Sequence, residues 1–213
     1  VSGSGAVVRP DVVLHYTPGG FRFSLQDPVY QDADFPDMVA SYTYRTESGH
    51  AFNAAVTGRE VETGIDDSEF GAAFSLAAKF NFGDTALALG GYTGKGNNVY
   101  SGWGYNGATN PSTIAARGEV DASGDLVSTT GLSAGLSHRF SDRLRGNIRY
   151  AQVEADEVAP TVADDTLQMV NVNLIYTYLP NLDFGIEWRD RNATTMPLRP
   201  AGQQVELMAM YKF

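Results

Sequence analysis

Apolar and polar residues alternate along the final segment of the chain. Val205, Leu207 and Tyr211 fall on one face of an extended strand there, because strand side chains point alternately to opposite sides. Glu206 and Lys212 fall on the other face. An apolar face that ends in aromatic residues, opposite a polar face, is typical of a strand in a transmembrane β-barrel. One such segment could equally be a half-buried strand of a soluble β-sandwich, so its repetition along the chain matters more than the segment itself.

The same alternation predicts about eleven amphipathic strands, most of them close to the roughly 9–11 residues that cross a membrane. The predicted strands span residues 8–17, 20–27, 37–46, 50–61, 69–82, 85–95, 127–140, 143–154, 166–179, 182–191 and 203–213. This pattern predicts an all-β fold, a transmembrane antiparallel β-barrel. No linker or change of composition divides the chain, so we expect residues 1–213 to form a single barrel domain.

The predicted connections alternate in length. Short turns are expected at 17–20, 47–49, 83–84, 141–142 and 180–181. Longer connections are expected at 27–37, 62–68, 95–125, 155–165 and 192–202. Short periplasmic turns alternating with long extracellular loops are typical of outer-membrane barrels, and soluble sandwiches do not usually sort their loops so regularly.

The strand count is odd, whereas bacterial single-chain barrels have an even number of strands and no open edge. We therefore expect an odd number of strands to precede this chain. The alternative is that one strand within 95–125, or one near the start, escapes the pattern.

Composition narrows the classes of function. The formal net charge is −10, which disfavours nucleic acid as a partner. No apolar run approaches the roughly 18 residues of a membrane-spanning helix. Cysteine is absent, so the chain has neither disulfides nor thiolate chemistry. Tyr and Phe each number 11, which suits the aromatic girdles of a barrel.

Basic side chains share the faces predicted to point inward. The residues predicted to line a solute pathway are Arg22, Arg45, Arg59, Lys79, Arg145, Asn147, Arg149 and Arg189, with His15, Arg139 and Lys212 on the same faces. Guanidinium groups pair bidentately with carboxylates, so this set favours the passage of anions. The alternative is that these residues pair with inward acids, namely Asp183, Glu187 and Glu206, and only fill the wall.

Acidic residues gather instead in and beside the long connections. Such loops could bind divalent cations or bridge to lipopolysaccharide, but solvated loop residues are the simpler interpretation, and no EF-hand spacing is present. We expect no metal site and no cofactor. The glycine-rich segment 90–96 lacks P-loop spacing. The connection 95–125 could fold inward, cover the mouth or contact a neighbouring subunit.

A catalytic site is not expected. His15, His50 and His138 lie on three separate predicted strands, and neither GxSxG nor HExxH occurs. An outer-membrane barrel enzyme would need a cluster of acids and bases at its outer rim. We therefore expect a protein that is not an enzyme.

Several segments resemble the DcaP-like porin family of proteobacteria. They are PDVVLHYT (10–17), GFRFSLQDP (20–28), PDMVASY (36–42), SHRFSDRLR (137–145), VNVNLIY (170–176), LDFGIEW (182–188) and the terminal YKF. The resemblance implies a trimeric barrel of about sixteen strands that admits small dicarboxylates and other anions. It covers the later part of the family's pattern, without the upstream strands.

The sequence therefore predicts a porin in the outer membrane of a Gram-negative bacterium. It would conduct small anionic solutes passively, dicarboxylates among them, and would contact membrane lipid and lipopolysaccharide as a homotrimer. The alternatives are an outer-membrane barrel enzyme and a non-conducting barrel used in adhesion or assembly. Tyr211 and Phe213 are expected to face lipid, and Phe213 to end an assembly signal.

Overall fold

The computed structural model describes residues 12–28, 33–64, 67–101, 119–120, 124–159, 162–193 and 202–212. They form one antiparallel sheet of eleven strands, each paired with its neighbour in sequence. The strands are β1 (Val13–Tyr16), β2 (Phe21–Gln26), β3 (Asp37–Arg45), β4 (Ala51–Gly64), β5 (Asp67–Phe82), β6 (Thr85–Lys95), β7 (Ser128–Arg139), β8 (Leu144–Ala159), β9 (Val162–Leu179), β10 (Leu182–Ala193) and β11 (Gly202–Tyr211). One short helix, α1 (Asn98–Ser101), follows β6.

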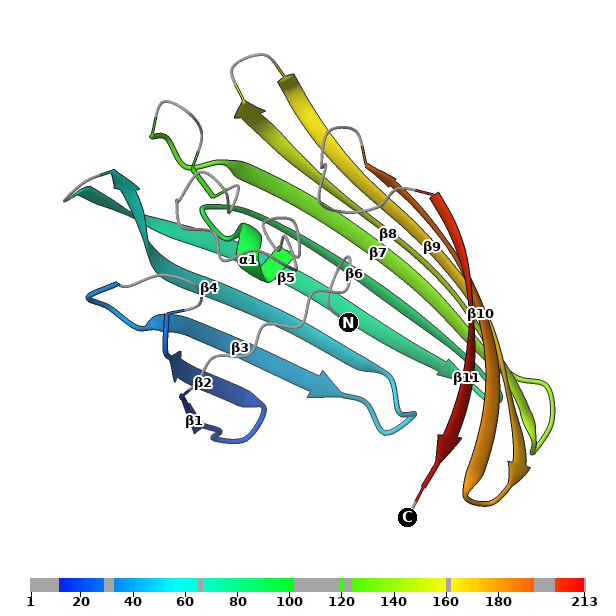
Figure 1. Cartoon of the computed structure of the whole chain (residues 1–213). Coiled ribbons are helices and arrows are strands. Elements are labelled where there is room, and N and C mark those ends of the chain that lie inside the picture. The colour runs from blue at the N-terminus through cyan, green and yellow to red at the C-terminus, as the bar shows by residue number, and fades with distance from the viewer. Residues whose placement is uncertain are drawn as a thin grey trace.

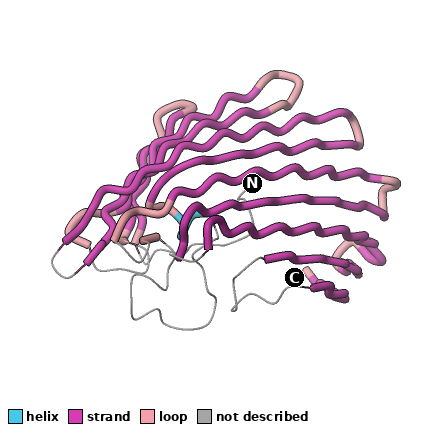
Figure 2. The backbone as a smooth tube through the Cα atoms, turned by 90° about the horizontal axis from the view of Figure 1, so that it is seen from above, coloured by secondary structure: helices cyan, strands magenta, loops and turns pink. Residues whose placement is uncertain are grey.

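The sheet curves into an arch, and α1 lies on its concave side (Figures 1 and 2). The predicted number of strands and the all-β antiparallel fold are confirmed. Within the described residues, β1 and β11 form the two edges of the sheet and do not pair with each other. A closed barrel of sixteen strands stays a prediction.

The short turns all lie at one end of the arch, because each joins an odd-numbered strand to the next in an antiparallel series (Figure 1). Gly19, Gly49 and Gly83 adopt positive φ angles of 60°, 82° and 61° in the first three turns. Glycine reaches this conformation without the steric penalty of a Cβ atom. The predicted sorting of turns and loops to opposite ends is therefore confirmed.

Two of the predicted long connections are wrong. Strand β4 continues to Gly64 and β5 begins at Asp67, so most of 62–68 is paired strand. In the same way β8 continues to Ala159 and β9 begins at Val162. Backbone pairing continues through polar residues such as Asp156, which faces Asp164. Apolar and polar residues alternate along a strand only where one of its faces meets an apolar surrounding. The alternation therefore stops before the ends of these strands.

The two faces of the sheet differ sharply. Apolar side chains are exposed on the convex face, among them Phe23, Val56, Phe74, Leu76, Leu132, Ile148, Leu174, Ile186 and Leu207. A buried apolar cluster of Val127, Val153, Ala155 and Leu167 lies instead on the concave face. A sheet with apolar residues exposed on its outer face suits an apolar surrounding such as lipid.

At the C-terminus, Tyr211 is exposed, at 54%, on the apolar face, as predicted. Phe213 lies outside the described residues. Among the residues that the structure describes, no helix is long and apolar enough to cross a membrane.

Candidate functional site

Strand registers align the basic residues of the concave face into one row. Arg45 pairs with Ala51 and Ala51 with Lys79, so a continuous line of facing positions crosses the sheet. From β3 to β11 the row reads Arg45, Ala51, Lys79, Ala88, Gly135, Arg149, Asn171, Arg189 and Gln204. Four of the eight predicted pathway residues therefore belong to one row, which we call the basic row.

From β3 to β10, the positions of the basic row move away from the end of the sheet that carries the short turns. Arg45 is the last residue of β3 and adjoins its turn, whereas Arg189 lies seven positions after the start of β10 at Leu182. Neighbouring strands are about 4.8 Å apart, so Arg45 and Lys79, two strands apart, stand at positions roughly 10 Å apart. This spacing is close to the Debye length at physiological salt, and the fields of neighbouring charges in the row overlap.

The residues between these cations are small. Ala51, Ala88 and Gly135 occupy the intervening positions and cannot shield the charged groups. Arg45 and Lys79 are exposed, and neither makes an ion pair within the described part of the chain. These two cations are therefore accessible to a dissolved anion.

Arg22 lies on the same face one strand earlier, where it pairs with Ser41. It too is exposed and makes no ion pair with another described residue. Arg22 lies outside the basic row, toward the long connections. It adds a third accessible positive charge to this side of the concave face.

The other end of the basic row is partly neutralised. Arg189 is half-buried and forms an ion pair with Glu206, and its Nη2 atom also donates to Gln204 Oε1 at 2.9 Å. Arg149 is half-buried beside Asn171, its partner in the row. Glu206, one of the inward acids that the sequence offers as partners for the basic set, therefore pairs with Arg189.

A second group of charges holds the last strands together near their short turns. The buried carboxylate of Asp183 accepts from Arg145 Nη2 at 3.1 Å and from Lys212 Nζ at 3.0 Å. Thr177 Oγ1 donates to the same carboxylate at 2.7 Å. These contacts connect β8, β9, β10 and the residue after β11, so Arg145 is engaged within the wall.

Asn147 belongs to an amide network beside that group. Its Nδ2 atom donates to Asn173 Oδ1 at 2.7 Å. Asn173 and Asn171 each donate to one carboxylate oxygen of Glu187, both at 3.1 Å. Glu187 is thus held by amides, and among the described residues this inward acid forms no ion pair with an arginine.

Arg59 has a different environment from the one the sequence predicted. It is fully buried, with its Nε atom 3.4 Å from Asp37 and its Nη1 atom 2.5 Å from Glu119. Its guanidinium lies 5.7 Å from the ring centroid of Tyr100, in a cation–π contact. Since Glu119 and Tyr100 belong to the connection 96–127, Arg59 anchors that connection and does not present its charge to solvent.

Tyr100 completes this anchor. Its hydroxyl donates to Asp37 Oδ2 at 2.5 Å and also contacts Gln26. Burial raises the pKa of the Tyr100 hydroxyl, which stays a protonated donor. The described parts of the connection therefore fold against the concave face, which agrees with the inward placement among the three that the sequence left open. We call Arg59, Asp37, Glu119 and Tyr100 the anchor cluster.

Sequence reasoning did not identify the anchor cluster as a unit. Asp37 and Glu119 are among the acidic residues in and beside the long connections, for which solvent exposure is the simpler prediction. The one signal in the sequence is the inward position of Arg59 on its strand, because a buried arginine needs an acidic partner.

The three histidines have separate local partners. His15 Nδ1 lies 2.9 Å from Ser24 Oγ, and His138 Nδ1 lies 2.8 Å from Thr85 Oγ1. His50 Nδ1 accepts from the backbone N–H of Asn81 at 3.1 Å. Over the described ranges, no group of three or more His, Cys, Asp or Glu residues could hold a metal ion.

Comparison with known proteins identifies the fold. No protein-family model and no curated protein matches the sequence. The outer membrane channel DcaP of Acinetobacter baumannii matches with a TM-score of 0.77 and 18% identity, over 100% of this chain and 65% of that chain. This is the fold of Gram-negative outer-membrane β-barrel proteins. The predicted resemblance to DcaP is thus confirmed at the level of the fold.

Two structures of OmpT, an outer membrane protein of Vibrio cholerae, match less closely. A loop L8 deletion mutant gives a TM-score of 0.60 at 12% identity, over 93% of this chain and 61% of that chain. The in-vitro folded form gives 0.58 at 12% identity, over 93% and 62%. The chain therefore spans a little under two thirds of each of these three structures.

Proposed function

We propose that this protein is a porin of the Gram-negative outer membrane, through which small anionic solutes diffuse passively. The observation that carries the proposal is the basic row, in which Arg45 and Lys79 are exposed and make no ion pair with a described residue. Positive charge along a polar wall raises the local concentration of anions and disfavours cations.

The balance of charges on the concave face supports an anion preference. Arg145 and Lys212 share one carboxylate, so that group keeps a positive charge. Arg189 is balanced by Glu206. Arg45 and Lys79 have no acid opposite them, since their facing positions hold alanine. Pairing therefore removes only part of the positive charge.

Dicarboxylates are the solutes that benefit most from such a wall. Two flexible basic side chains based roughly 10 Å apart can each approach one carboxylate of a short dianion. Small residues between them leave room for the solute. Assembly as a homotrimer and contact with lipopolysaccharide stay predictions from the resemblance and from the acidic loops.

A catalytic role has less support. The histidines are dispersed, and the matched DcaP structure is described as a channel. A non-conducting barrel would need its interior closed by paired charges. The anchor cluster is such a group of pairs, but it lies beside the connection 96–127 and away from the row positions of Arg45 and Lys79.

The test is the ion selectivity of the full-length protein in planar bilayers. Arg45→Ala combined with Lys79→Ala should lower the ratio of chloride to potassium permeability at least about fourfold at low salt, because a unit charge about 5 Å from an ion contributes about 0.8 kcal/mol even in water. The control is Arg139→Ala with Arg143→Ala, which removes the same formal charge at the short turns. Equal effects of the two double variants would contradict a role for the basic row.

A further inference from the structure

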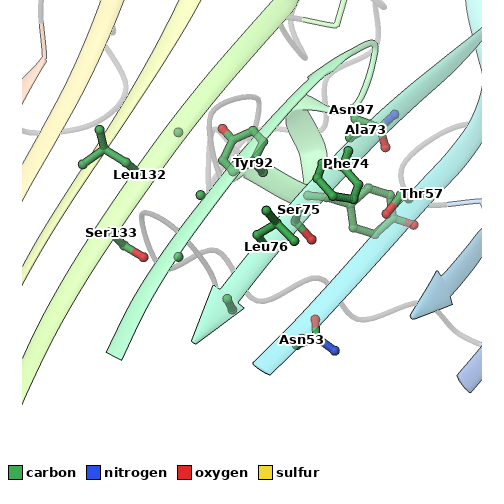
Figure 3. Close-up of a pocket in the computed structure, with 15 residues that line it drawn as sticks. Asn53, Thr57, Ala73, Phe74, Ser75, Leu76, Tyr92, Asn97, Leu132 and Ser133 are labelled. Atoms are coloured by element: carbon green, nitrogen blue, oxygen red, sulfur yellow. The ribbon is translucent and has the colours of Figure 1, made fainter. Parts of the chain in front are cut away.

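A hollow of about 190 Å³ lies on the concave face next to α1 (Figure 3). Its polar lining consists of Asn53, Thr57, Ser75, Tyr92, Asn97, Tyr100 and Ser133. Ala73, Ala77, Gly90 and Gly131 line it too, and their small size leaves the space open. The lining comes from β4, β5, β6 and β7 together with the segment that follows β6.

Several polar groups of this hollow have unused hydrogen-bonding capacity. The hydroxyls of Thr57, Ser75 and Ser133 make no side-chain hydrogen bond within the described part of the chain. Asn97 is 1% exposed, and its Oδ1 atom has no hydrogen-bond partner there. A buried amide oxygen without a partner is unfavourable, so a donor from a bound solute would stabilise it.

The chemistry of the lining is that of hydroxyl recognition. Each serine or threonine hydroxyl can both donate and accept a hydrogen bond. An asparagine amide donates through its NH₂ group and accepts through its carbonyl oxygen. Tyr92 and Tyr100 add aromatic rings. None of the described lining residues carries a charge, so the hollow on its own suits a neutral hydroxylated group.

Two positively charged side chains lie near the hollow. Lys79 follows Ala77 by two positions on the same strand face, which is roughly 7 Å along β5. Ser133 pairs with Ala151, and Arg149 precedes Ala151 by two positions on that face. Two cations of the basic row therefore lie close to the hollow, both on the side of the short turns.

We propose that the hollow and the basic row together bind hydroxylated monocarboxylates of the sugar-acid class. The carboxylate pairs with Lys79, and the hydroxyl groups of the solute bind Thr57, Ser75, Ser133 and Asn97. The inference rests on the proposed function and deepens it, because it names a further class of anion that binds in the pathway, beside the dicarboxylates.

The test compares gluconate with hexanoate, which has the same charge and six carbons but no hydroxyl group. Block of chloride current through the full-length protein in planar bilayers gives an apparent dissociation constant for each. Wild type should bind gluconate at least about tenfold more tightly than hexanoate, since two or three hydrogen bonds supply a factor of that order.

The discriminating variant is Thr57→Val with Ser75→Ala and Ser133→Ala, which removes three hydroxyls and keeps both cations. It should abolish most of the preference for gluconate over hexanoate. The control is Thr93→Val with Thr130→Val, whose hydroxyls lie 3.2 Å apart on the convex face, and it should keep the preference. Should the triple variant fail to fold, Ser75→Ala alone should reduce the preference about threefold.

The outcomes separate this inference from the proposed function. Equal block by gluconate and hexanoate in an anion-selective wild type would overturn the sugar-acid inference and leave the porin proposal intact. A wild-type preference for gluconate that survives in the triple variant would also overturn it. A wild type without anion selectivity would overturn the proposed function, and the pairing of a carboxylate with Lys79 would be overturned with it.

Discussion

Two sides of the concave face use the same residue types in different ways. On β3 and β5, Arg45 and Lys79 face alanines, are exposed, and form no ion pair within the part of the chain that the structure describes. On β8 to β11, Arg145 and Arg189 lie beside acids and are paired. The difference comes from the surrounding positions, which hold alanine beside Arg45 and Lys79 and place a carboxylate within reach of Arg145 and Arg189. An inward arginine therefore indicates a solute pathway only where its neighbours leave it accessible.

The anchor cluster is the extreme case of pairing, and its loss should have the largest effect. Arg59→Met would leave Asp37 and Glu119 buried without their cation, which typically costs about 3–5 kcal/mol. We expect lower stability toward urea in lipid vesicles and faster proteolysis within the connection that follows β6.

Arg139→Ala is the control for Arg59→Met. Arg139 pairs with Asp84 at an exposed site, where an ion pair contributes little. If both variants unfold at the same urea concentration as wild type, the anchor cluster does not hold the connection.

A single substitution should free the paired cations on the β8–β11 side of the concave face. Asp183→Asn removes the acid shared by Arg145 and Lys212, whose side chains are 40% and 51% exposed. Both cations then face solvent without a counter-charge, so chloride selectivity should rise while resistance to urea falls. Selectivity is measured from the reversal potential under a salt gradient. An unchanged reversal potential in a folded variant would show that this group lies off the solute pathway.

Removal of an accessible cation on the β3–β5 side should leave the stability of the protein nearly unchanged. Lys79→Ala removes an exposed cation that pairs with no described acid, so the free energy of unfolding should change by less than about 0.5 kcal/mol. Chloride selectivity should nevertheless fall at low salt and recover toward wild type near 1 M salt, where the Debye length is only about 3 Å. A loss of selectivity that does not depend on salt would point to a change of pore shape.

Much of this arrangement followed from the sequence, and its limits have physical causes. Alternation assigned Arg45, Lys79 and Arg149 to the inward face, because the period of a strand is two residues. It could not show that they share a row, since register depends on the turn lengths and on irregularities such as the shift between Leu182 and Asp183.

The contacts of the long connection were also beyond the sequence. Nothing in the pattern around Tyr100 or Glu119 indicates that they reach Arg59, because the docking of a loop depends on tertiary geometry. The hydroxyls of Thr57 and Ser75 fell on the polar strand faces, but their grouping in one hollow required the fold.

The central claim is that accessible cations of the basic row make the pathway selective for anions. The most direct test is the reversal potential of Arg45→Glu with Lys79→Glu, measured under a potassium chloride gradient at low ionic strength. The wild-type protein should prefer chloride, and the charge-reversed variant should show a potential of opposite sign. A variant that keeps the wild-type sign and magnitude would contradict the claim.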